Sequence, residues 1–536
     1  MSDANHVDAV IVGAGLAGLY QLHRLRGLGL CTRVFEAAGD VGGTWYWNRY
    51  PGARCDIESL SYSYSFSPEL EQDWTWTEKY PTQPEVLRYL RHVAERFDLR
   101  RDITFHTRVT SAVYDDGSAR WTVTTGAGEV VSTRFLIMAT GCLSTSKEPE
   151  IPGKERFAGK TYHTGHWPHD GVDFTGQRVG VIGTGSSGIQ IIPILAKQAA
   201  DLTVFQRTPN FSLPAGNRPL TAEEVGDRKA HYPERRQAER ESGFGVAVPL
   251  PTRSALEATP DERQDIYQRG WEQGSLVGIM TAYTDILTDK AANDTAAEFI
   301  RQQIRSIVKD PQVAEALAPR SHAVGSKRLC LDTNYYATFN EPHVHLVDLR
   351  ATPLTEITER GVQTSAREHA FDAIVFATGF DAMTGTLLAI DIRGMEGVSL
   401  RDRWAQGPRT YLGLAIAGFP NLFTITGPSS PSVLSNMMVS IEQHVDWISD
   451  CIAFLRDRGV AAIAATRDAE DAWAAHVELV GNATVYPTAD SWYMGSNVPG
   501  KPRVFMAYIG GVGAYRQKCD EVARNGYEGF ALIPRA

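Results

Sequence analysis

Several features are scarce in this chain of 536 residues, and each scarcity argues against a class of function. There are only six cysteines and no C-x-x-C pair, so neither a disulfide-reductase centre nor a zinc site is expected. The net charge of -10 argues against a nucleic acid or an acidic membrane as partner. No apolar run reaches membrane-spanning length, and the first residues lack the basic segment of a signal peptide. We therefore expect a cytoplasmic protein with reduced thiols and no bound metal.

The composition is that of an ordinary globular protein, and the first informative pattern lies near the N-terminus. Residues 7–12 (VDAVIV) predict a strand that is buried on both faces of a parallel sheet. Gly13, Gly15 and Gly18 follow as G-x-G-x-x-G, before a helical segment at 19–29. The next predicted strand ends on Glu36, 23 positions after Gly13, where an acidic residue can meet a ribose hydroxyl. Strand, turn, helix and acidic residue together predict a dinucleotide site.

The same unit recurs in the middle of the chain. A strand at 177–182 (QRVGVI) precedes Gly183-x-Gly185-x-x-Gly188, and a helix is predicted at 189–198. The second strand of this unit ends on Arg207, in the neighbourhood where the first unit has Glu36. An arginine there suits a 2′-phosphate, although a solvated charge at a strand end is the simpler alternative. The contrast favours FAD at the first site and NADPH at the second.

The remaining segments complete a predicted α/β fold with two Rossmann-like domains. Residues from about 221 to 319 have helical spacing and charge runs, which we interpret as a mostly helical insertion with solvated faces. Strand-like runs return at 343–349 and 371–380, and a long helix is expected at 439–455. The predicted boundaries are 1–145 and 386–536 for the FAD-binding domain with a C-terminal loop, 146–220 and 326–385 for the NADP-binding domain, and 221–325 for the insertion.

Longer motifs carry a resemblance to a known family. The stretch FAGKTYHTGHWP at 157–168 reads F-x-G-x-x-x-H-x-x-x-W-P, and GGTWYWNRYPGARCD occupies 42–56. The triplets at 139–141 and 377–379 are both Ala-Thr-Gly, and SWYMGSNVPGKPRVFMAYIGGVGAYR lies at 491–516. Over nearly its whole length the chain resembles the Baeyer–Villiger monooxygenases, and most closely their phenylacetone and steroid branch. The resemblance implies oxidation of ketones to esters or lactones with NADPH, FAD and O2, through a C4a-peroxyflavin.

The same resemblance implies roles for individual residues. Arg328 would stabilise negative charge on the reacting oxygen, and Asp56 would orient it, although Lys327-Arg328 alone is a common surface pair and Asp56 could be a helix N-cap. His163 and Trp167 are interpreted as structural. FAD is assigned to Gly13, Gly15, Ala17, Glu36, Thr44, Trp45, Trp47, Asp56, Tyr62, Val109 and Met437. NADP is assigned to Arg54, Gly183, Thr184, Gly185, Ser186, Ser187, Gly188, Arg207, Thr208, Lys327 and Trp492. The expected pocket residues are Ile57, Leu329, Ser432, Val433, Leu434 and Met437.

Two other functions stay open at this point. An N- or S-oxidising flavin monooxygenase would share both nucleotide units, but the closing Trp-Pro of the signature and the Lys327-Arg328 pair argue against it. A non-catalytic flavin-bound redox sensor would oxidise NADPH at a rate that no ketone changes. We expect small-molecule partners only, a ketone and O2, and a monomer or weak oligomer.

Overall fold

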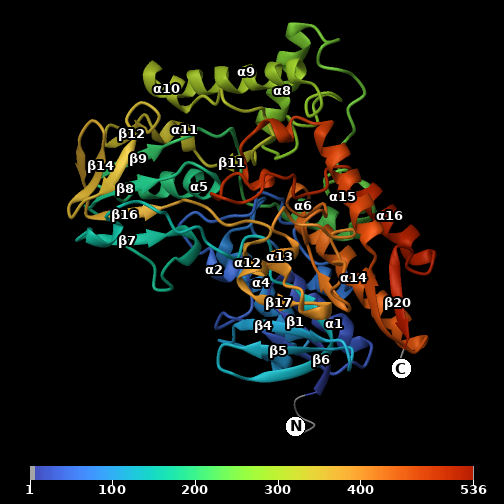
Figure 1. Cartoon of the computed structure of the whole chain (residues 1–536). Coiled ribbons are helices and arrows are strands. Elements are labelled where there is room, and N and C mark those ends of the chain that lie inside the picture. Colours follow the sequence, from blue (N-terminus) through green and yellow to red (C-terminus); the bar gives the residue numbers. More distant parts are fainter. Residues whose placement is uncertain (1–5, 535–536) are drawn as a thin grey trace.

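The computed structural model describes residues 6–534, in which two sheets carry the two glycine-rich turns. The terminal residues 1–5 and 535–536, which the sequence assigned to the FAD-binding domain, lie outside the described residues. Figure 1 shows the first sheet at the bottom of the molecule, the second to its upper left, and the helices α8, α9 and α10 across the top.

The first sheet has eight strands in the order β17-β4-β5-β6-β1-β2-β3, with β18 paired to β6. Its strands are β1 (His6–Val12), β2 (Thr32–Phe35), β3 (Ile103–Thr104), β4 (Val109–Asp115), β5 (Arg120–Thr125), β6 (Val130–Met138), β17 (Asp391–Arg393) and β18 (Leu422–Thr424). The strands β1, β2, β3, β6 and β18 run parallel, whereas β5 is antiparallel to both of its neighbours. A segment from the last quarter of the chain thus completes a sheet begun at the N-terminus.

The second sheet has five parallel strands in the order β12-β9-β8-β16-β7. These strands are β7 (Lys160–His163), β8 (Arg178–Ile182), β9 (Asp201–Gln206), β12 (Val344–Asp348) and β16 (Ala373–Phe376). One smaller sheet pairs β10 (Ser212–Pro214) with β11 (Cys330–Asp332), and another pairs β19 (Val460–Ala465) with β20 (Phe530–Pro534). A third contains, in this order, β13 (Leu354–Ile357), β14 (Gly361–Thr364) and β15 (Glu368–Ala370). The α/β fold predicted from the repeated strand–turn–helix units is confirmed.

Both glycine-rich turns have the same steric cause. Gly13 (φ 106°) and Gly183 (φ 115°) are left-handed, and a Cβ on either would lie 2.5 or 2.4 Å from the carbonyl oxygen of Ala139 or Ala377. These two alanines are the first residues of the Ala-Thr-Gly triplets, so each triplet packs directly against the glycine-rich turn of one nucleotide site. Only glycine permits that approach.

Helices cover the sheets and form the insertion. In and around the two sheets lie α1 (Leu16–Gly27), α2 (Thr44–Trp47), α3 (Pro68–Asp73), α4 (Gln83–Arg96), α5 (Ser186–Leu195), α11 (Tyr335–Thr338), α12 (Gly385–Ala389) and α13 (Leu400–Arg403). The C-terminal helices are α14 (Met437–Asp457), α15 (Arg467–Asn482) and α16 (Val512–Arg524). Helix α14 lies against α1, where Tyr20 donates to Asp446 at 2.7 Å and Gln21 donates to Ser449 at 3.0 Å.

The insertion is helical as predicted. It contains α6 (Ala222–Ala230), α7 (Tyr232–Glu241), α8 (Pro260–Gln273), α9 (Lys290–Ile307) and α10 (Pro311–Leu317). The continuous charged segment at 223–241 is two helices, because Pro233 in the first turn of α7 has no N–H with which to continue α6.

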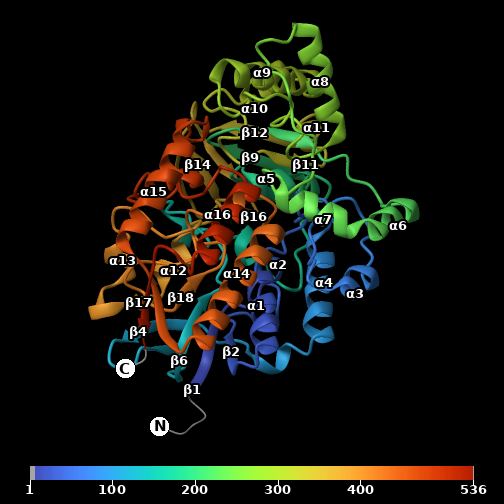
Figure 2. The same ribbon diagram turned by 90° about the vertical axis from the view of Figure 1, so that its right-hand side faces the viewer.

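The sequence predicted solvated faces for the charge runs of the insertion, but the charge run of α7 is partly buried. Arg236 and Glu239 are only 6% and 1% exposed in their side chains. They form an ionic cluster with Arg228 and Glu71, which ties α7 to α3. Figure 2 shows α6 and α7 beside α3 and α4. Burial of these charges is tolerated because each one is paired.

Candidate active site

An ion pair between Arg328 and Asp56 joins distant parts of the chain. The Arg328 Nη2 donates to both carboxylate oxygens of Asp56 at 2.8 Å, and Nε donates to Oδ2 at 3.1 Å. Arg328 Nη1 donates to the Val433 carbonyl at 2.7 Å. No helix begins at Asp56, so the N-cap alternative is wrong, and the carboxylate is used to orient the arginine.

Tyr493 is a further partner of Arg328 that the sequence did not single out. Its hydroxyl accepts a hydrogen bond from the guanidinium. Burial alone would lower the pKa of Arg328, but the nearby Asp56 carboxylate and the Tyr493 hydroxyl outweigh it, and the pKa lies above the ordinary value for arginine. Arg328 therefore remains charged at any pH at which the protein is folded.

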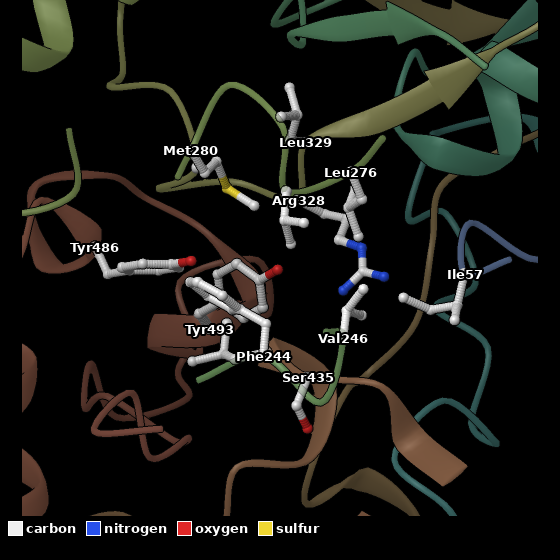
Figure 3. A pocket seen from close by; sticks show the side chains of 13 residues that line it. Ile57, Phe244, Val246, Leu276, Met280, Arg328, Leu329, Ser435, Tyr486 and Tyr493 are labelled. Atoms are coloured by element: carbon white, nitrogen blue, oxygen red, sulfur yellow. The ribbon is translucent and has the colours of Figure 1, made fainter. Parts of the chain in front are cut away.

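A largely apolar cavity opens beside this arginine. The lining side chains nearly close it, and the space left free inside is about 30 Å³. Figure 3 shows the Arg328 guanidinium and the Tyr493 hydroxyl turned toward each other among apolar side chains. The lining residues are Ile57, Phe244, Val246, Leu276, Val277, Met280, Gly325, Arg328, Leu329, Leu434, Ser435, Tyr486 and Tyr493. An apolar wall with one fixed cation suits an uncharged substrate whose reacting oxygen becomes negative.

The expected pocket residues divide into two groups. Ile57, Leu329 and Leu434 line the cavity. Val433, Ser432 and Met437 are not among the lining residues. Val433 contributes its carbonyl to Arg328, and the Ser432 hydroxyl lies 4.0 Å from the Met437 sulfur.

Much of the cavity wall was missed by sequence reasoning. Phe244, Val246, Leu276, Val277 and Met280 belong to the insertion, and Tyr486 and Tyr493 belong to the C-terminal region. The short apolar interruptions of the charged insertion, FGVAV at 244–248 and SLVGIM at 275–280, were the available signal.

The first nucleotide site has the features that FAD requires. Helix α1 begins at Gly15 without a side-chain cap, which leaves the N–H groups of its first turn available to a phosphate. The buried Glu36 carboxylate accepts from the N–H groups of Ala14 (2.6 Å) and Ala38 (2.7 Å). Burial raises the pKa of Glu36, although these bonds oppose the change. A carboxylate accepts more than two hydrogen bonds, so Glu36 keeps sites for a ribose.

The other expected FAD residues lie on several elements of the chain. Trp45 donates its indole N–H to the Tyr62 hydroxyl at 3.1 Å, which fixes both rings close to Asp56. Thr44, Trp45 and Trp47 form the short helix α2, Ala17 is buried in α1, Val109 begins β4, and Met437 begins α14.

The second nucleotide site fits an NADP phosphate group. Helix α5 also starts at a glycine without a side-chain cap, Gly185, and a Cβ there would meet open space. Thr184 donates to the Thr208 carbonyl at 3.1 Å, and Ser186 lies 3.1 Å from the Cys330 sulfur. Ser187 and Gly188 lie in the first turn of the helix.

Three basic residues were also assigned to this second site. Arg207 is exposed just after β9, and Lys327 is close enough to it that Arg207, together with burial, lowers the pKa of Lys327. The third, Arg54, pairs with Glu78 at 2.6 Å.

The signature residues His163 and Trp167 have structural surroundings, as interpreted. His163 Nδ1 accepts from the Gly165 N–H at 3.0 Å, so its Nε2 carries the proton, and that nitrogen lies 3.1 Å from the Thr378 hydroxyl. Burial lowers the pKa of His163, which keeps the ring neutral. Trp167 is buried beside Tyr162 and Phe174. His163 thus joins the segment after the first Ala-Thr-Gly triplet to the second triplet, and Trp167 packs against β7.

Residues 6–534 hold neither a membrane-spanning helix nor a candidate metal site. No helix in this range is long and apolar enough to cross a membrane. The same range contains no group of three or more His, Cys, Asp or Glu side chains that could hold a metal ion.

Comparison with known proteins defines first the class and then the family. Residues 10–222 match the family described as Pyridine nucleotide-disulphide oxidoreductase. A Baeyer-Villiger monooxygenase of Pseudooceanicola batsensis is 42% identical over 97% of this chain and 95% of its own. Phenazine N-monooxygenase PhzNO1 of Lysobacter antibioticus is 42% identical over 99% and 98%. The solved structure of oxidized steroid monooxygenase bound to NADP is 54% identical, with a TM-score of 0.95 over 99% of this chain and 100% of the other.

This chain belongs to the Baeyer–Villiger monooxygenase family. It is an enzyme that uses FAD and NADPH, as the two glycine-rich turns predicted. The resemblance noted from the sequence motifs is confirmed.

Proposed function

We propose that this monooxygenase acts on aryl-substituted or bulky cyclic ketones and converts them to esters or lactones. The observation that carries the proposal is the apolar cavity beside Arg328, whose walls include Phe244, Leu276 and Tyr486. Such walls favour a substrate with a large hydrocarbon body, because each buried methylene contributes about 0.8 kcal/mol. The 54% identity to a steroid monooxygenase points in the same direction.

Arg328 is the catalytic residue in this proposal. When bound, the flavin and NADPH supply the electrons and activate oxygen. The chain itself supplies a permanent positive charge, which Arg328 directs at the oxygen that becomes negative as the ketone carbonyl is attacked. Asp56 holds the guanidinium plane through both of its oxygens, so the donor is oriented before the reaction begins.

The nucleotide assignments follow from the two turns. We propose that Glu36 accepts from the FAD ribose and that Arg207 and Lys327 hold the 2′-phosphate of NADPH. Arg207→Ala should raise the Michaelis constant for NADPH about ten- to hundredfold and leave NADH use nearly unchanged, because one charge-assisted hydrogen bond is lost. Equal kinetics with NADPH and NADH in the unmutated enzyme would contradict the assignment.

The boundaries expected from the sequence are retained as part of the proposal. The FAD-binding domain comprises 1–145 and 386–536, the NADP-binding domain 146–220 and 326–385, and the insertion 221–325. Strands β17 and β18 in the first sheet, and β12 and β16 in the second, support this division.

A monomer or weak oligomer in the cytoplasm is also proposed. Exposed large apolar side chains, such as Leu256, Met395 and Leu479, lie far apart in the sequence, which suits a small contact area at most. The six free cysteines fit a reducing compartment. Sedimentation of the FAD-loaded enzyme would test the first point.

Ketone specificity is tested by the rate of NADPH oxidation with product identification. Phenylacetone, cyclohexanone and acetone are compared by their specificity constants. The specificity constant for phenylacetone should exceed that for acetone by about fiftyfold or more, since burying half of its six ring carbons contributes about 2.4 kcal/mol. A clear preference for acetone would reject the substrate class.

N-oxidation is the second candidate, because a phenazine N-monooxygenase matches this chain over almost its whole length. The same assay with phenazine as substrate separates the two functions. A specificity constant for phenazine above that for every ketone would favour N-oxidation.

A further inference from the structure

Three positive side chains gather near the second glycine-rich turn, and one of them has no assigned role. They are Arg207, Lys327 and Lys147, the last of which follows the first Ala-Thr-Gly triplet by six positions. Burial lowers the pKa of Lys147 and of Lys327, and the charge of Arg207 lowers both further. Within residues 6–534 none of the three forms an ion pair with a carboxylate. Glu150 and Asp381 near Lys147, and Asp490 near Lys327, oppose these shifts without reaching ion-pair distance. Positive charges that no carboxylate contacts directly can together bind a dianion.

The main chain of Lys147 is fixed by the second Ala-Thr-Gly triplet and by His163 of the signature motif. Its N–H donates to the Gly379 carbonyl at 2.9 Å, and its carbonyl accepts from the Thr378 hydroxyl at 2.8 Å. The His163 Nε2, which carries the proton, lies 3.3 Å from the same carbonyl. These main-chain hydrogen bonds therefore determine where the Lys147 side chain begins.

Both lysines also bind one loop of the C-terminal region. Lys147 donates to the Asn497 carbonyl, and Lys327 donates to the Asp490 carbonyl. The Asn497 side chain donates in turn to the Phe380 carbonyl at 2.8 Å. We call residues 490–501 the C-terminal loop.

This loop reaches the catalytic arginine. Lys501 anchors its end to Asp381 at 2.6 Å, and within it Tyr493 bonds to Arg328. The same loop thus carries the two carbonyls that Lys147 and Lys327 bind and the Tyr493 hydroxyl that faces Arg328.

We propose that Lys147 is a third ligand of the NADPH 2′-phosphate and that, with Lys327, it bridges this phosphate to the C-terminal loop. An ammonium group has three N–H donors, so each lysine can hold a loop carbonyl and a phosphate oxygen at once. The 2′-phosphate then orders the loop that carries Tyr493 to Arg328, in addition to providing affinity. This inference rests on the proposed assignment of Arg207 and Lys327 to the 2′-phosphate.

The first experiment measures nucleotide binding to the FAD-loaded, oxidised enzyme. Lys147→Met should weaken NADP⁺ binding about ten- to hundredfold and change NAD⁺ binding less than about twofold, because NAD⁺ lacks only the 2′-phosphate. Lys147→Arg should recover most of the NADP⁺ affinity. The matched control is Lys197→Met, on an exposed lysine just after the other end of α5, which should change neither value. Unchanged NADP⁺ affinity in Lys147→Met, or equal losses for both nucleotides, would overturn the proposal.

The second experiment follows amide hydrogen exchange of the C-terminal loop, again without ketone. At saturating nucleotide, NADP⁺ should slow exchange at residues 490–501 about tenfold more than NAD⁺ does, and Lys147→Met should remove that difference. Equal protection by both nucleotides in the unmutated enzyme would overturn the coupling. Neither experiment includes ketone turnover. A failure of this inference can therefore be distinguished from a failure of the proposed substrate class.

Discussion

Replacing Arg328 with lysine keeps a positive charge at the active site but removes the planar geometry of the guanidinium. The guanidinium makes three contacts with Asp56 and one with the Val433 carbonyl, and it also bonds to Tyr493. An ammonium group has three donors at a single point and cannot span both Asp56 oxygens and Val433 while facing a substrate. Charge is retained in Arg328→Lys, but the preorganised donor is lost.

The expected magnitude follows from that loss. Removal of one preorganised donor to a developing oxyanion typically lowers the rate about a hundred- to a thousandfold. Arg328→Lys should therefore form ester about a hundred- to a thousandfold more slowly than the unmutated enzyme, and Arg328→Ala should form no detectable ester. FAD binding should persist in both, because Glu36 and the first glycine-rich turn are independent of Arg328.

Two measurements make the comparison. Anaerobic stopped-flow absorbance gives the rate of flavin reduction by NADPH, which should remain measurable in both variants. Gas chromatography and a peroxidase assay then divide the consumed NADPH between ester and hydrogen peroxide, and hydrogen peroxide should dominate. The control is Arg305→Lys, at an exposed ion pair of α9 with Glu315, which should behave as the unmutated enzyme. Ester formation by Arg328→Lys at a near-normal rate would refute the reasoning.

Three other changes give further expectations. Tyr493→Phe removes one partner of Arg328, and it should lower the rate of ester formation about tenfold while leaving the rate of flavin reduction within about twofold, as stopped-flow absorbance can check. Glu36→Gln should raise the dissociation constant of FAD about ten- to hundredfold, measured by flavin fluorescence, and an unchanged constant would contradict the ribose role. Burial lowers the pKa of His322 to about 4 from an ordinary value of 6.5, so its contribution to stability is complete above pH 6.5 and is lost as the pH falls toward 4. His322→Phe should therefore flatten the pH dependence of the unfolding free energy in this window by at most about 1.4 kcal/mol per pH unit, measured by urea denaturation, and an unchanged slope would contradict it.

The nucleotide-binding parts were predictable because their signals are local. Gly13 and Gly183 must be glycine for a steric reason that acts within one turn, and the strands beside them are short apolar runs. The α/β class and both cofactors followed from these signals. The break between α6 and α7 had a local signal too, Pro233, which was not used.

The substrate side was less predictable because it is assembled by long-range packing. Phe244 and Leu276 read as interruptions in a charged helical segment, and nothing nearby in sequence shows that they meet Arg328. Tyr493 lies 165 positions from Arg328 and approaches it only because its loop is tied down at both ends. The burial of Arg236 likewise depends on Glu71, which belongs to another part of the chain.

The origin of the cavity wall has a consequence for divergence among related enzymes. Its apolar side chains between Phe244 and Met280 belong to neither nucleotide sheet and make no direct polar contact with Arg328 or Asp56 among the described residues. Exchanges in this segment can therefore reshape the space for substrate while both cofactors stay bound. A mutant library confined to 244–280 should change which compounds are oxygenated at a small cost in holoenzyme yield, whereas one directed at 42–56 should mostly yield protein that has lost its flavin.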